Sequence, residues 1–151
     1  MKAPLLISVL LACTSAWAAD ITVSGEWIRT VTASDLTAGA GSDLVSEQTS
    51  SAGTVTLALT ATGGGAWRIK VRHAPSPWNG NLTLWVRRTS DGTGAGSLSG
   101  GSGYVQLTAL DTDFFSGAGD RSNISLQYKL SGLSKTVSPD TYQSAVVFTI
   151  E

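Results

Sequence analysis

Cysteine and histidine each occur only once in the 151 residues, as Cys13 and His73. A single cysteine cannot close a disulfide within the chain, and a single histidine leaves no second imidazole for a zinc site. A serine-histidine relay would depend on His73, but no Gly-x-Ser-x-Gly elbow occurs at a strand-to-helix turn. The chain also shows no obvious pair of catalytic carboxylates and no P-loop lysine. We therefore expect neither enzymatic activity nor a cofactor.

Charged residues are scarce as well. They make up 14% of the chain, against about 25% in an average domain. The formal net charge is −1, which gives no electrostatic reason to expect nucleic acid as a partner. Glycine, serine and threonine take the place of charged residues, and this balance is typical of short strands joined by many turns.

The first eighteen residues have the pattern of an export signal. Lys2 supplies the positive charge, and the apolar run Leu5 to Ala12 is too short to span a bilayer. Ala16-Trp17-Ala18 fits a small-x-small cleavage site. We expect residues 1–18 to be a signal peptide and residues 19–151 to be a single domain without a transmembrane segment. The expected location is the periplasm, the cell surface or the extracellular space.

A second interpretation of the same region involves the cysteine. Leu10-Leu11-Ala12-Cys13 resembles a bacterial lipobox, and cleavage there would make Cys13 the lipid-bearing end of an envelope lipoprotein. Cleavage after Ala18 would instead remove Cys13 and leave the mature chain without any thiol. Both alternatives remain open at the level of the sequence.

Apolar and polar residues alternate with period two in many places, which predicts an all-β fold. The clearest runs are residues 122–130 and 142–150, and similar patterns occur near residues 21–27, 55–59, 67–71, 82–86 and 105–109. We expect an immunoglobulin-like antiparallel β-sandwich of about seven or eight strands, with a jelly roll or small barrel as alternatives. The last strand is expected in a central or near-central position, and residues 90–103 are expected to be a mobile loop.

A hairpin over residues 67–88 predicts one candidate surface. If His73 pairs with Leu82, the apolar residues of both strands face inward. Basic and aromatic residues then share the outer face, and Trp78 lies in the proline-rich turn. This surface is a candidate contact for an acidic glycan, an anionic surface or a neighbouring subunit, or else an ordinary solvated face. The candidate binding residues are Arg68, Lys70, Arg72, Trp78, Trp85 and Arg87.

Two further candidate sites come from tryptophan and aspartate. Trp27 and Trp67 face inward by their phase, whereas Trp78 and Trp85 are expected to be exposed and are candidates for stacking on sugars. Asp111, Asp113 and Asp120 lie close in sequence and carry the oxygen ligands that calcium prefers, but their spacing departs from the calcium-loop pattern and turn chemistry explains them equally well. We predict no metal site.

The two ends of the chain together resemble a known group of proteins. Ile21-Thr22-Val23-Ser24-Gly25 and the segment Asp140 to Ile150 are similar to the ends of bacterial fimbrial subunits and spore-coat-U-like secreted proteins. The resemblance implies donor-strand assembly, in which an N-terminal strand of one subunit completes the sandwich of another. The alternative is that residues 21–27 pair within their own domain. The implied subunit contacts are Ile21, Val23, Trp27, Tyr142, Val146, Phe148 and Ile150.

These observations predict a non-enzymatic, secreted subunit of a cell-surface layer or a pilus-like filament, with a structural or adhesive role. Its expected partner is another surface subunit or a second copy of itself, joined by strand addition. A secreted carbohydrate-binding module is the first alternative, with a glycan as partner. An envelope lipoprotein anchored at Cys13 is the second.

Overall fold

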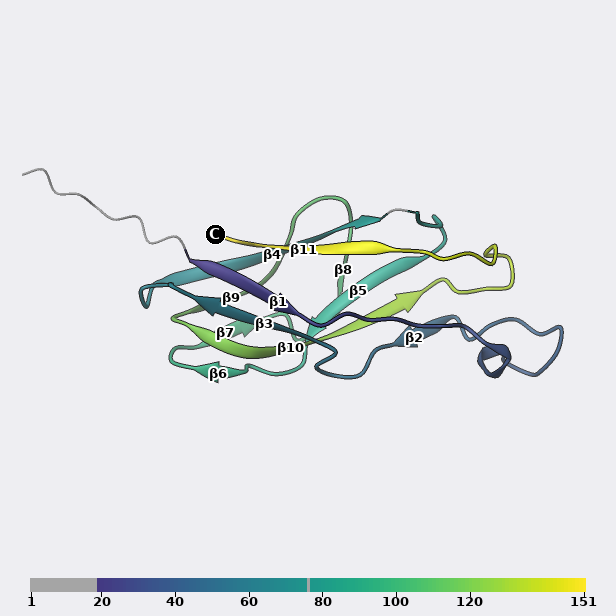
Figure 1. The fold of residues 1–151 in the computed structure, drawn as a ribbon, viewed down its shortest axis with the longest axis horizontal. Helices are drawn as coiled ribbons and strands as arrows, with labels where there is room; N and C mark the ends of the chain where they lie inside the picture. Colours follow the sequence, from purple (N-terminus) through teal and green to yellow (C-terminus); the bar gives the residue numbers. More distant parts are fainter. Residues whose placement is uncertain (1–18, 76) are drawn as a thin grey trace, which may run out of the picture.

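The computed structural model describes residues 19–75 and 77–151 and confirms an antiparallel β-sandwich built from a seven-stranded and a four-stranded sheet (Figure 1). The larger sheet has the strand order β1-β3-β10-β5-β8, and β2 and β6 also pair with β10. The smaller sheet has the order β11-β4-β9-β7. The expected signal peptide and Cys13 lie outside the described residues. The elements are β1 (Asp20–Ser24), the 3-10 turn η1 (Ala33–Asp35), β2 (Glu47–Thr49), β3 (Val55–Thr60), β4 (Ala66–Pro75), β5 (Thr83–Arg88), β6 (Thr93–Gly94), β7 (Leu98–Gly100), β8 (Val105–Gln106), β9 (Thr112–Ala118), β10 (Arg121–Ser131) and β11 (Ser144–Ile150).

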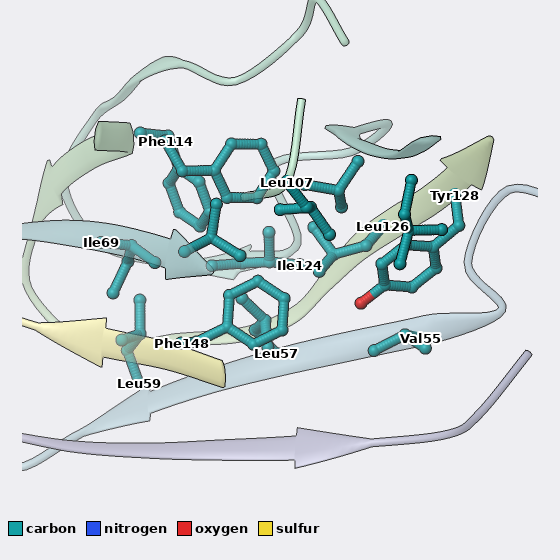
Figure 2. Close-up of a cluster of buried hydrophobic side chains, with 14 of the residues drawn as sticks. Val55, Leu57, Leu59, Ile69, Leu107, Phe114, Ile124, Leu126, Tyr128 and Phe148 are labelled. Atoms are coloured by element: carbon teal, nitrogen blue, oxygen red, sulfur yellow. The ribbon is translucent and has the colours of Figure 1, made fainter. Parts of the chain in front are cut away.

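The alternating apolar residues form the core between the two sheets. Leu57 and Leu59 of β3, Ile69 of β4, and Ile124 and Leu126 of β10 are at most 1% exposed. Figure 2 shows these side chains meeting phenylalanine and tyrosine rings from both sheets. The inward faces that the alternation predicts are therefore confirmed, because each strand buries one face and leaves the other toward solvent.

The predicted hairpin over residues 67–88 is wrong. β4 pairs with β9 and β11 in the smaller sheet, whereas β5 pairs with β10 and β8 in the larger one. The chain therefore crosses from one sheet to the other between Pro75 and Thr83. Both arrangements bury the same residues, because alternation specifies which face of a strand is buried and not which strand lies beside it.

The predicted position of the last strand is also wrong. Among the described strands β11 pairs with β4 alone and forms one edge of the smaller sheet, and β1 forms an edge of the larger sheet. β1 lies beside β11 across the open side of the sandwich (Figure 1). Tyr142, which was expected on the same strand, lies before β11, and its hydroxyl donates to the carbonyl oxygen of Ser138 at 2.7 Å.

Phe114 and Phe115 are neighbours in sequence and both are buried. In the pairing of β4 with β9, Ile69 lies opposite Phe115 and Lys70 lies opposite Asp113, so Phe114 is the extra residue of a β-bulge. A bulge turns two consecutive side chains toward the same face of a sheet. The two rings pack edge-to-face with their centroids 4.9 Å apart.

The composition of residues 90–103 predicts a mobile loop, but this glycine-rich segment contains two short strands. It contains β6 and β7, which pair with β10 and β9. A side chain at Gly92, Gly94 or Gly96 would collide with a backbone carbonyl of residues 118–122. The alternation of glycine therefore lets this segment lie against the β9–β10 turn.

Two arginine side chains bond to backbone carbonyls of the glycine-rich segment. Arg88 donates from Nη2 to the carbonyl oxygen of Gly100 at 2.8 Å and pairs with Asp91. Arg121 is buried and donates to the carbonyl oxygens of Asp91 and Gly96. Burial and the nearby charge of Arg121 lower the pKa of Arg88. The guanidinium groups satisfy carbonyls that the short strands leave unpaired.

Candidate functional site: an open sheet edge and its groove

The backbone of β11 presents unpaired polar groups along the edge of the smaller sheet. Glu151 and Arg68 exchange both backbone hydrogen bonds, at 2.8 and 2.9 Å. In an antiparallel pair the bonded positions alternate, so the backbone groups of Thr149 and Val147 also point toward β4. Those of Ser144, Val146, Phe148 and Ile150 point toward the open edge.

An apolar groove of about 1190 Å³ lies along this edge. We call it the edge groove. One wall comes from the end of β1 and the segment that follows it, and the other comes from β11 with the loop before it. The floor comes from the larger sheet. Residues that line it include Trp27, Trp78, Tyr128, Leu130, Leu133 and Val146.

The structure brings together most of the residues that the sequence assigns to subunit contacts. Val23 and Trp27 line one wall of the edge groove, and Tyr142, Val146 and Phe148 line the other. Trp27 stacks on Tyr128 with the ring centroids 6.4 Å apart and the planes 9° from parallel.

β1 pairs within its own domain in this structure. Ile21 lies opposite Leu59 and Val23 opposite Leu57 of β3. This strand has only five residues and leaves Val23 45% exposed. It ends at Ser24, and the next residue, Gly25, has a φ of 99° and lies so close to the carbonyl of Thr54 that a Cβ would collide with it.

His73 closes one end of the pairing between β4 and β11. Its Nδ1 lies 3.2 Å from the hydroxyl oxygen of Ser144, and its ring packs edge-to-face on Trp78 with the centroids 5.6 Å apart. Burial lowers the pKa of His73, which favours the neutral imidazole. Trp78 was expected to be exposed, but it is half-buried, packs against the core and donates its indole N–H to the carbonyl oxygen of Leu82 at 3.0 Å.

The predicted basic and aromatic surface is divided between opposite faces of the sandwich. Arg68, Lys70 and Arg72 lie on the outer face of the smaller sheet, and each pairs with a carboxylate: Asp113 at 3.4 Å, Glu151 at 2.9 Å and Asp111 at 3.4 Å. The hydrogen bond to Glu151 raises the pKa of Lys70. Trp85 and Arg87 lie on β5 in the other sheet. The six candidate residues therefore do not form one surface.

The three aspartates considered for calcium do not converge. Two of them form the ion pairs with Arg68 and Arg72, and Asp120 accepts hydrogen bonds from the backbone and hydroxyl of Thr62 at 2.9 and 2.6 Å. These bonds lower the pKa of Asp120. Within residues 19–75 and 77–151, no three potential metal-ligating side chains come together.

A polar cluster on the outer face of the larger sheet includes residues that the sequence interpretation missed. We call it the outer cluster; it consists of Glu47, Trp85, Arg87, Tyr104, Gln127, Lys129 and Ser131. The ammonium of Lys129 lies 5.2 Å from the ring centroid of Trp85 and 5.0 Å from that of Tyr104. Arg87 donates from Nε to Oε1 of Gln127 at 2.8 Å. The alternation of apolar and polar residues in β10 places Gln127 and Lys129 on the outer face, and this pattern could have identified them from the sequence.

Comparisons with known proteins add no family to this description. No protein-family model matches the chain, and no curated protein or solved structure matches it significantly. In the described part of the chain, no helix has the length and apolar character needed to cross a membrane. The geometry of the edge groove and of the outer cluster is therefore the basis for any functional proposal.

Proposed function

We propose that this protein is an exported, non-enzymatic subunit of a cell-surface filament or layer, with a structural or adhesive role, and that its copies join by strand addition at β11. The observation that carries the proposal is the open edge of β11 beside the edge groove. A sheet edge with unpaired backbone groups is a ready template for a strand from another chain. Main-chain hydrogen bonds supply affinity in this mode of binding, and alternate side chains supply register.

The energetics support a strand rather than a small ligand at this edge. β11 is seven residues long and turns the backbone groups of alternate residues outward. Each hydrogen bond to an added strand contributes about 0.5–1.5 kcal/mol net, and the apolar walls of the edge groove add burial of alternate side chains. A strand of five or more residues can bond the outward backbone groups of β11, and apolar side chains at period two can pack against the walls of the edge groove.

The segment Asp20–Trp27 of a second copy meets these requirements. Ile21 and Val23 are apolar at period two, and Trp27 follows beyond the glycine. In the isolated chain this segment is a short edge strand on β3, so its transfer to a neighbour exchanges one edge pairing for another. Exchange of an identical element between protomers is a low-cost route to assembly.

Proline substitutions in β11 test the proposal. Val146→Pro removes an N–H that points to the open edge, so it should block strand addition while leaving the pairing with β4 in place. Val146→Ala removes most of the same side chain but keeps the N–H. We expect the wild-type protein and Val146→Ala to form concentration-dependent multimers in light-scattering measurements, and Val146→Pro to remain a folded monomer.

Two further variants complete the experiment. Val147→Pro removes an N–H that bonds β4 and should lower the melting temperature, which checks the assignment of inward and outward groups. Deletion of residues 20–27 should abolish assembly. A wild-type protein that stays monomeric at all concentrations, or a Val146→Pro variant that assembles normally, would refute strand addition at β11.

A further inference from the structure

Arg87 differs from the arginines and lysines on the outer face of the smaller sheet. On that face, each of three basic side chains pairs with a carboxylate. Arg87 instead donates from Nε to Gln127, and its guanidinium lies over the ring of Tyr104, 4.9 Å from the centroid. Among the described residues, its two terminal nitrogens have no hydrogen-bond partner and no carboxylate within ion-pair distance. The guanidinium is therefore positioned by its neighbours but not neutralised.

A second cation lies close to the same ring. The ammonium of Lys129 is 5.0 Å from the centroid of Tyr104, so the two positive charges are within about one Debye length of each other at 0.1 M salt. Glu47 contacts Lys129 at 3.1 Å and offsets one of the two charges. The outer cluster therefore keeps an excess of positive charge, although the whole chain has a formal net charge of −1. Such a local excess attracts an anion.

The groups around the two cations are neutral hydrogen-bonding side chains. Gln127 accepts from Arg87 and from the hydroxyl of Tyr104 at 3.1 Å, and its Nε2 donates to the carbonyl oxygen of Ser50 at 2.8 Å. Trp85 donates its indole N–H to the hydroxyl of Ser131 at 2.9 Å. The second amide hydrogen of Gln127 and the lone pairs of the Tyr104 and Ser131 hydroxyls can still bond a ligand that carries hydroxyl groups beside its negative charge. The site is on a half-exposed sheet face, which admits an extended polymer.

We propose that the outer cluster binds an acidic saccharide of the uronate type. The guanidinium of Arg87 takes the carboxylate through two parallel N–H bonds, which is the geometry that this side chain favours. Lys129 supplies a second charge, and Gln127 and Ser131 contact the sugar hydroxyls. Lys129 also lies over the rings of Trp85 and Tyr104, so a cation competes with a neutral sugar for one face of each ring.

Titration calorimetry with two matched probes tests this proposal on the purified protein. The first probe is α-1,4-linked trigalacturonate, and the second is the same trimer with all of its carboxylates methyl-esterified. We expect the acid to bind and the ester to give no detectable heat. Raising the salt concentration should weaken binding of the acid, because both protein charges are partly exposed. Equal binding of the acid and the ester would overturn the proposal, as would the absence of binding by the acid.

Two variants assign the binding to this face of the molecule. Arg87→Gln should weaken binding of trigalacturonate at least tenfold, and Lys129→Gln should weaken it less. Arg72→Gln, on the opposite face of the sandwich, should leave the affinity unchanged, and a thermal melt verifies that each variant is folded. Unchanged affinity in both cluster variants would place the binding elsewhere. Competition by acetate at the same carboxylate concentration would show that the hydroxyl contacts contribute nothing, which would refute the saccharide assignment.

Discussion

Replacing Gly92 with alanine tests whether the glycine-rich segment depends on close backbone approach. Gly92 has a φ of 64°, and a Cβ there would collide with the backbone of residues 122–124. Gly64 has a similar φ of 77° but nothing within 4 Å of the added atom. Gly103 has open space around it and no left-handed φ. The three alanine variants therefore separate the cost of the backbone conformation from the cost of the collision.

The expected magnitudes follow from these differences. Alanine in the left-handed region costs roughly 1–2 kcal/mol, and this is the one folded-state cost expected for Gly64→Ala, because nothing obstructs the added atom. At Gly103 the alanine only restricts the unfolded chain, which changes the free energy of unfolding by about +0.4 to +1 kcal/mol. At Gly92 the atoms in the way are backbone atoms, so β6 must separate from β10. Loss of that pairing and its hydrogen bonds brings the expected destabilisation to about 3–4 kcal/mol.

Urea denaturation at pH 7 measures the three free energies of unfolding directly. We expect the order Gly103→Ala, Gly64→Ala, Gly92→Ala from most to least stable, with a gap of about 2 kcal/mol between the last two. If Gly92→Ala were as stable as Gly64→Ala, the segment would tolerate separation from the β9–β10 turn. The account of its alternating glycines as points of backbone contact would then be wrong.

Two other predictions concern the core and the buried imidazole. Phe115→Ala should lower the free energy of unfolding by about 3–5 kcal/mol, whereas Leu110→Ala, at a residue that is 77% exposed, should change it by at most about 0.5 kcal/mol; similar values for both would refute the assigned core. Burial lowers the pKa of His73, so the unfolded chain binds this proton more readily, and stability should fall as the pH drops below about 6.5. His73→Gln should show a smaller change in melting temperature between pH 7.5 and 5.5, and an unchanged pH dependence would exclude His73 as its source.

The strands and their buried faces could be predicted from the sequence because the signal is local. In β10, apolar residues at every second position are enough to specify a strand and its inner face. The neighbours of a strand are not specified in this way. Arg68 and Arg87 were expected on the same surface because their strands are consecutive, yet the chain crosses between the sheets before β5 begins. Nothing in the alternation distinguishes a hairpin from such a crossing.

The candidate sites were predicted only in part for the same reason. The edge groove depends on which strands lie at the edges, and that is a property of the whole topology. The subunit contacts expected from the two chain ends fall mainly on β1 and β11, which contact each other in the structure. In the outer cluster, Trp85 and Arg87 were identified, but Tyr104 and Lys129 come from other parts of the chain and meet them only after folding.

The pairing of β11 with β4 has a consequence for the order in which the molecule forms. Ile150 of β11 pairs with Ile69 of β4, and the two residues are separated by about half the length of the chain. The smaller sheet is therefore completed only when β11 pairs with β4. Non-local pairings of this kind form slowly. Until β11 arrives, β4 presents an open edge of unpaired backbone groups on a partly folded chain, a state prone to aggregation. A newly made copy is therefore most vulnerable just before folding is complete, and any factor that shields β4 at that stage should raise the yield of native protein.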